Sequence, residues 1–204
     1  MLARGQMGPT LGGERLMPKY FGALTIVILI GMVVTRVLLM KRKGLEALQF
    51  GKMDKTDFLI PPFALFYFYL VFAAAFHLPT LSTQAFFHSG VISWAGVLFC
   101  LVGLALVLWS LVSFGQSFRV GIDPDRPDKL VTSGVFAFSR NPIYVAFALI
   151  LLGQFLIFPN WLVLVYLGGA LWLFHRQVLR EEEFLKKYYG NEYAQYCSRV
   201  RRYL

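Results

Sequence analysis

Charged side chains are scarce in this sequence. Asp, Glu, Lys and Arg together make up 15% of the 204 residues, whereas hydrophobic residues make up 57%. A soluble domain usually carries about 25% charged residues. An apolar share this large exceeds what one globular core can bury, so lipid must cover part of it. The composition therefore predicts an integral membrane protein.

Several common site signatures are absent as well. The only two cysteines, Cys100 and Cys197, suggest neither a disulfide framework nor a zinc site, and the three histidines lack metal-ligand spacing. The chain contains no Gly-x-Gly-x-x-Gly, Walker or Gly-x-Ser-x-Gly motif. These absences exclude a Rossmann methyltransferase or dehydrogenase domain, a P-loop site and an α/β-hydrolase nucleophile. No metal site and no nucleic-acid module is predicted.

Long apolar segments are plentiful. A helix needs about 20 residues to cross a hydrocarbon core of about 30 Å. We expect an all-α integral membrane protein with about five transmembrane helices, the last two forming a helical hairpin around Pro159 and Asn160. The fifth helix should continue as a C-terminal extension, because no helix breaker occurs before Gly190. The five predicted spans are residues 20–40, 58–76, 91–112, 142–158 and 161–174.

Basic residues are distributed unevenly between the predicted loops. Residues 77–90 contain no Lys or Arg, whereas the tail after Phe174 contains seven. Short loops rich in Lys and Arg stay on the cytosolic side. The C-terminus and the polar loop before the fourth span are therefore expected in the cytosol. The net charge of +9 is attributed to this topology and to anionic lipids rather than to nucleic acid.

Residues 115–141 form a polar segment too long and too rich in Gly, Asp and Pro to be a minimal connection. At its end, Asn141 is suited to cap the fourth span and Pro142 to occupy its first turn. A helix N-terminus carries unpaired N–H groups that suit a carboxylate or a phosphate. Capping at a membrane interface is the simpler alternative.

Three successive glutamates lie on the predicted extension of the fifth span. Glu181, Glu182 and Glu183 cover about 200° of a helix, so all three cannot share one solvated face. At least one should point toward the polar loop, although an exposed pair of Glu182 with Lys186 is the simpler alternative. The tyrosines that follow are expected in an interfacial aromatic belt; they are Tyr188, Tyr189, Tyr193, Tyr196 and Tyr203.

Two motifs in this half of the chain resemble the isoprenylcysteine carboxyl methyltransferase family and its prokaryotic relatives. The first is the run from Leu130 to Phe136 followed by Arg-Asn-Pro-x-Tyr at 140–144, where the family has Tyr instead of Phe136 and His instead of Asn141. The second begins with the glutamate pair and continues with the residues Leu185, Tyr189, Gly190, Tyr193 and Tyr196. The resemblance covers about half of the chain.

The resemblance implies a cofactor, S-adenosylmethionine, and a set of site residues. Substrate contacts are expected at Arg176, Gln177 and Arg180, where the family has an Arg in place of Gln177. Catalytic roles are expected for Arg140, Asn141 and Tyr144. The cofactor-binding residues implied are Asp128, Lys129, Leu130, Val131, Gly134, Phe136, Asn141, Pro142, Ile143, Tyr144, Glu181 and Glu182.

The implied reaction is methyl transfer to a lipid-anchored or lipid-like substrate that enters from the bilayer, such as the carboxylate of a prenylated cysteine. Residues 1–19 would then be an N-terminal segment, 20–113 the first three spans and 114–204 the catalytic region. An NADPH-dependent membrane reductase of the sterol-reductase type is the alternative, with a similar C-terminal pattern. A catalytically silent membrane scaffold is a third reading, because Asn141 and Gln177 depart from the family pattern.

Overall fold

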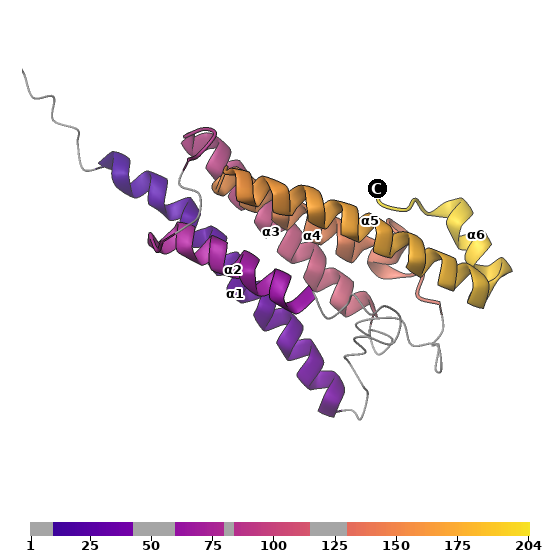
Figure 1. Cartoon of the computed structure of the whole chain (residues 1–204). Coiled ribbons are helices and arrows are strands. Elements are labelled where there is room, and N and C mark those ends of the chain that lie inside the picture. The colour runs from indigo at the N-terminus through magenta and orange to yellow at the C-terminus, as the bar shows by residue number, and fades with distance from the viewer. Residues whose placement is uncertain (1–9, 43–59, 80–83, 115–129) are drawn as a thin grey trace, which may run out of the picture.

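The structure, a computed structural model, describes residues 10–42, 60–79, 84–114 and 130–204. All regular elements in these ranges are helices (Figure 1). Each of the five predicted apolar segments forms an α-helix, and two shorter helices accompany them. In chain order the elements are α1 (Thr10–Arg42), α2 (Ile60–Phe76), α3 (Gly90–Phe114), the 3₁₀ helix η3 (Gly134–Ala137), α4 (Pro142–Ile157), α5 (Trp161–Tyr189) and α6 (Asn191–Arg199).

Three of the helices are long and apolar enough to cross a membrane, namely α1, α3 and α5. The apolar helices α2 and α4 are shorter, with 17 and 16 residues. Large apolar side chains remain exposed on these helices, for example Leu98 at 62%, Val112 at 69% and Val165 at 66%. Apolar surface on this scale needs a lipid environment. The protein is therefore a helical membrane protein.

The tightest helix contact joins α3 and α4. A Cβ atom added to Gly153 would lie 2.5 Å from the carbonyl oxygen of Gly96, and one added to Gly96 would lie 2.6 Å from the carbonyl oxygen of Gly153. Only glycine at both positions allows the two backbones to approach so closely. Small residues at such crossings are typical of helix packing in membranes.

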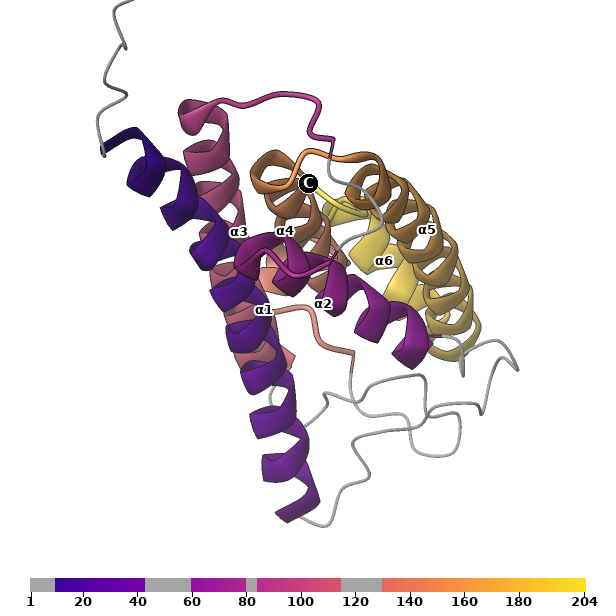
Figure 2. The same cartoon turned by 60° about the vertical axis from the view of Figure 1, so that its left-hand side comes forward.

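Helices α4 and α5 are joined by a short turn in which Asn160 caps α5. Its side-chain oxygen accepts a hydrogen bond from the Val163 N–H at 3.1 Å. The side chain of Gln154, fully buried in α4, donates a hydrogen bond to the carbonyl oxygen of Gly22 at 2.8 Å and so ties α4 to α1. Figure 2 shows α2 in front of α4, between α1 and α5.

The C-terminal part of the chain contains the predicted extension of α5 and a further short helix. Helix α5 continues to Tyr189 and ends at Gly190, as predicted, with φ of 52° at that glycine. Beyond it lies α6, a nine-residue helix whose bounds the pattern did not predict and which buries Tyr193 and Tyr196. Figure 1 shows that the chain reverses after α5, so that the C-terminal residues return toward the side of α5.

Replacing Gly153 with Ala should destabilise the protein, because the new methyl group would overlap the Gly96 carbonyl of α3. Overpacking of this kind costs about 1–3 kcal/mol. The measurement is thermal unfolding in detergent, followed by circular dichroism at 222 nm. Gly168→Ala in α5 is the matched control, because a Cβ atom there meets nothing within 4 Å. Equal melting temperatures for the two variants would contradict the proposed contact.

Candidate active site

The predicted polar groups meet where α4 begins. Asn141 occupies the N-cap position and Pro142 the first turn, as the sequence predicted. The Asn141 side chain does not cap the helix, however. Its Nδ2 donates hydrogen bonds to Glu182 Oε1 at 3.2 Å and to the carbonyl oxygen of Arg202 at 3.1 Å. Asn141 therefore connects α4 to α5 and to the C-terminal tail.

Glu182 is the centre of a buried ion-pair network. The residue is 9% exposed. Arg202 Nε and Nη2 each lie 2.9 Å from Glu182 Oε2, and Arg140 Nη2 lies 3.4 Å from Oε1. The alternative reading of Glu182 as part of a solvated face paired with Lys186 is therefore wrong. Glu182 contacts Arg140 and Asn141 at the described end of the polar loop, as predicted for at least one of the three glutamates.

Glu181 faces the same end of α4 through a second set of contacts. Tyr144 donates a hydrogen bond from its hydroxyl to Glu181 Oε1 at 2.6 Å. Gln177, one helical turn before it on α5, donates from Nε2 to the same oxygen at 3.1 Å. Two donors on one carboxylate oxygen hold the side chain in a single orientation. Glu183, the third of the run, is exposed.

Arg140 connects several elements but keeps one donor free. Its backbone N–H donates to the carbonyl oxygen of Arg201 at 3.0 Å, and its Nη1 donates to the sulfur of Cys197. The Nε atom is buried and has no hydrogen-bond partner among the described residues. An unsatisfied buried donor costs about 1–3 kcal/mol. A donor in this state is a candidate contact for an anionic ligand group.

The segment before α4 is hydrogen-bonded to the end of α3 and to α6. Gly134 has φ of 64°, and the hydroxyl oxygen of Ser113 accepts a hydrogen bond from the next N–H, that of Val135, at 3.2 Å. A Cβ atom on Gly134 would lie 2.4 Å from that hydroxyl oxygen, so the position requires glycine. The Phe136 ring packs against Phe114 with centroids 4.5 Å apart.

Two of the tyrosines predicted to lie in an interfacial belt are instead buried inside the protein. Tyr193 is 3% exposed and Tyr196 is 5% exposed. The hydroxyl of Tyr196 donates to the carbonyl oxygen of Phe136 at 2.7 Å. Burial raises the pKa of Tyr196 to about 12, so its hydroxyl keeps the proton it donates at neutral pH. For these two tyrosines the belt prediction is wrong, since α6 packs over the loop.

The remaining predicted residues are distributed around this cluster. Leu130, Val131 and Ile143 are half-buried beside it, and Pro142 is fully buried. Arg176 is exposed and lies 5.8 Å from the ring of Trp172, pointing along α5 rather than joining the Glu181 contacts. Arg180 is half-buried. Asp128 and Lys129 lie outside the described residues.

Sequence reasoning missed the tail that completes the cluster. Arg202 pairs with Glu182, and this hydrogen bond raises the pKa of its guanidinium. Tyr203 lies 2.7 Å from His175 Nδ1 through its hydroxyl oxygen. Charge complementarity was the available signal, because three arginines, Arg199, Arg201 and Arg202, follow the three glutamates in the sequence. The pattern was assigned to membrane topology instead.

Fold and site together define a helical membrane protein that builds a polar cluster, with two carboxylates and two arginines, at one end of its helices. A family model described as phospholipid methyltransferase matches residues 91–192, half of the chain, which includes the first motif, the second motif as far as Gly190, and most of this cluster. The chain belongs to this family of methyltransferases.

The names of similar proteins agree with the family resemblance that the two motifs indicate. A probable protein-S-isoprenylcysteine O-methyltransferase of Oryza sativa subsp. japonica is 30% identical over 112 residues, which are 53% of this chain and 59% of the relative. The protein-S-isoprenylcysteine O-methyltransferase of Schizosaccharomyces pombe is 32% identical over 105 residues, 50% of this chain and 44% of the relative. The protein-S-isoprenylcysteine O-methyltransferase of Xenopus laevis is 30% identical over 131 residues, which are 59% of this chain and 44% of the relative. The matched part thus spans about half the length of these relatives.

Removing the Glu182 carboxylate should be far more costly than removing its neighbour. Glu182→Ala leaves Arg140 and Arg202 without their shared counter-ion, and breaking a buried pair costs about 3–5 kcal/mol. Glu183→Ala is the control on the exposed face and should change stability by less than about 0.5 kcal/mol. Chemical unfolding in detergent measures both. A Glu182→Ala protein as stable as Glu183→Ala would refute the ion-pair network.

Proposed function

We propose that this protein transfers a methyl group from S-adenosylmethionine to the carboxylate of a lipid-anchored or lipid-like substrate, as an isoprenylcysteine O-methyltransferase does. The observation that carries the proposal is the meeting of the two motifs. They are separated by a full helical hairpin in sequence, yet Tyr144 contacts Glu181 at 2.6 Å and Asn141 contacts Glu182 at 3.2 Å. The names of the relatives support the same reaction.

The residues present fit the chemical groups of this cofactor. S-adenosylmethionine carries a carboxylate, an ammonium group and two ribose hydroxyls. The buried Nε of Arg140 has no hydrogen-bond partner in the described part of the chain and is suited to the carboxylate. Glu181, oriented by Tyr144 and Gln177, is suited to the ammonium group or a hydroxyl. The half-buried side chains of Leu130 and Val131 offer apolar contact at the loop.

When bound, the cofactor supplies a methyl group already activated on a sulfonium sulfur. The acceptor carboxylate is ionised at neutral pH, so the chain needs no general base. Asn141 therefore suffices where the family has a histidine. The residues of the chain contribute by binding, by aligning the acceptor and by excluding water. The cluster of Asn141, Glu182 and Arg202 holds the first turn of α4 in place for this task.

The substrate is proposed to reach the site from the membrane. Basic residues are frequent in the loops and the tail that the sequence assigns to this end of the helices, and by the positive-inside rule this supports a site on the cytosolic side. A lipid-modified substrate would keep its chain in the bilayer and present its carboxylate at the interface. Such a substrate gives a physical reason for building a methyltransferase from membrane helices.

Cofactor binding separates this proposal from a sterol-reductase-type enzyme. The purified protein should bind tritiated S-adenosylmethionine in equilibrium dialysis, and Glu181→Ala should weaken binding at least tenfold, about 1.4 kcal/mol, because a charge-assisted contact is lost. Glu183→Ala should bind as the wild type does. Binding of NADPH without binding of S-adenosylmethionine would refute the proposal. Unchanged affinity in Glu181→Ala would refute the assigned site.

The acceptor group can be tested with a small substrate. A farnesylated N-acetylcysteine with a free carboxylate should become methylated, as detected by base-labile volatile radioactivity. The corresponding primary amide should not react, because it lacks the nucleophilic oxygen anion. Methylation of the amide, or of neither compound while phosphatidylethanolamine is methylated, would show that the acceptor is not a carboxylate.

A further inference from the structure

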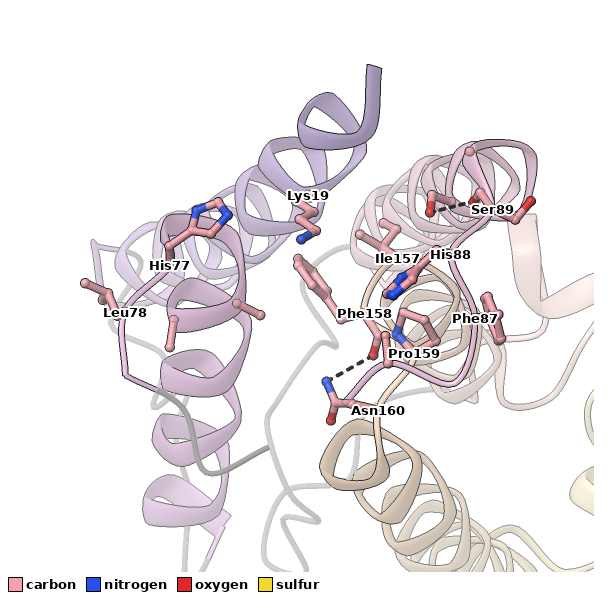
Figure 3. A pocket seen from close by; sticks show the side chains of 15 residues that line it. Lys19, His77, Leu78, Phe87, His88, Ser89, Ile157, Phe158, Pro159 and Asn160 are labelled. Carbon is pink, nitrogen blue, oxygen red and sulfur yellow. Dashed lines mark hydrogen bonds between the residues drawn. The ribbon is translucent and has the colours of Figure 1, made fainter. Parts of the chain in front are cut away.

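A cavity of about 430 Å³ lies at the opposite end of the helices from the candidate active site. Four parts of the chain that are distant in sequence line it: α1 near Lys19, the end of α2 at His77, the segment before α3 at His88, and the turn between α4 and α5 at Asn160 (Figure 3). A hydrogen bond from the Phe86 N–H to the carbonyl oxygen of Pro159, at 2.7 Å, joins two of these parts.

The ionisable residues of the lining are all basic. They are Lys19, His77 and His88, and the fifteen residues that line the cavity, all of them described, include no Asp or Glu. None of the three basic side chains has a hydrogen bond or ion pair with another described residue. In contrast, Asn160 uses its amide on the Phe158 carbonyl and on the Val163 N–H. Among the described residues, the cavity thus offers donors without a hydrogen-bond partner and a lysine without a counter-ion.

His77 adopts a backbone conformation that is unusual for its residue type. Its φ is 57°, and it is the one residue other than glycine with positive φ among those described. The Leu78 N–H closes the end of α2 by donating to the Ala73 carbonyl at 3.0 Å, a helix ending in which glycine normally occupies the position of His77. The left-handed conformation is unfavourable for a residue that carries a Cβ atom. Such strain is commonly retained where the side chain has a function.

Lys19 is likewise not explained by membrane topology. The charge asymmetry that orients the helices leaves residues 77–90 at this end without Lys or Arg. Lys19 runs against the pattern, as Arg4 and Arg15 before it in the sequence do, and its side chain lines a cavity. A ligand with a negative charge would account both for the lysine and for the strained histidine.

The rest of the lining is apolar and continues to the exposed surface of the helices. Ala73, Ala74, Ile157 and Phe158 line the cavity, and Phe76 next to it is 53% exposed. We propose that the cavity binds the phosphate group of a phospholipid headgroup, with its glycerol and first acyl carbons against the apolar wall. Lysine and histidine donate charge-assisted hydrogen bonds to phosphate oxygens. The apolar wall favours a lipid over a free phosphate ion.

Binding to the full-length protein in detergent tests this site. Native mass spectrometry should show one tightly bound molecule of 1-palmitoyl-2-oleoyl-phosphatidylglycerol, whereas inorganic phosphate should bind at least tenfold more weakly. Lys19→Ala should lower the affinity for phosphatidylglycerol at least tenfold. Lys186→Ala, which removes an exposed lysine at the other end of α5, should leave it unchanged.

His77→Gly separates binding from folding. Glycine adopts positive φ without strain, so the melting temperature of this variant should equal or exceed that of the wild type, while its affinity for phosphatidylglycerol falls severalfold. Affinity unchanged in both Lys19→Ala and His77→Gly would overturn the proposal. Equal affinity for inorganic phosphate and phosphatidylglycerol would overturn the assignment to a lipid and make the site one for soluble phosphate. Neither result depends on methyl transfer.

Discussion

One buried carboxylate holds the functional end of this protein together. Glu182 accepts a hydrogen bond from Asn141 and forms an ion pair with Arg140, both directly before α4, and it pairs with Arg202 of the C-terminal tail. A carboxylate removed from water this far is stable only with partners of opposite charge. Its requirement for those partners brings the first turn of α4, the end of α5 and the C-terminal tail to one place. Glu181 is then left to face Tyr144 and Gln177, where a ligand can be held.

The helices behind this network provide a rigid base. Glycines let α3 and α4 approach to backbone contact, and Ser113 at the end of α3 holds the loop that precedes α4. Close backbone packing leaves few alternative arrangements, so the start of α4 cannot shift without moving α3. A site for aligning two reactants benefits from such a base, because small displacements of the reacting groups slow a reaction strongly.

The two ends of the bundle differ in how their charges are balanced. At the active-site end, two arginines are paired with Glu182, and the Arg140 Nε has no partner among the residues that the structure describes. At the other end, Lys19, His77 and His88 surround a cavity whose lining contains no acidic residue among those described. The first arrangement suits a ligand that carries both charges, as the proposed cofactor does. The second suits an anion alone.

Hydropathy and local signals in the sequence determined the helices: five apolar segments, the start of α4 at Pro142 and the end of α5 at Gly190 are all readable without a structure. The motifs also determined which family the chain belongs to. The tertiary structure decided the partners of Asn141 and Glu182, the burial of Tyr193 and Tyr196 by α6, and the return of Arg202 to the site. Helix formation depends on neighbours along the chain, whereas these pairings join groups 20 to 61 residues apart, and only packing brings such groups within hydrogen-bonding distance.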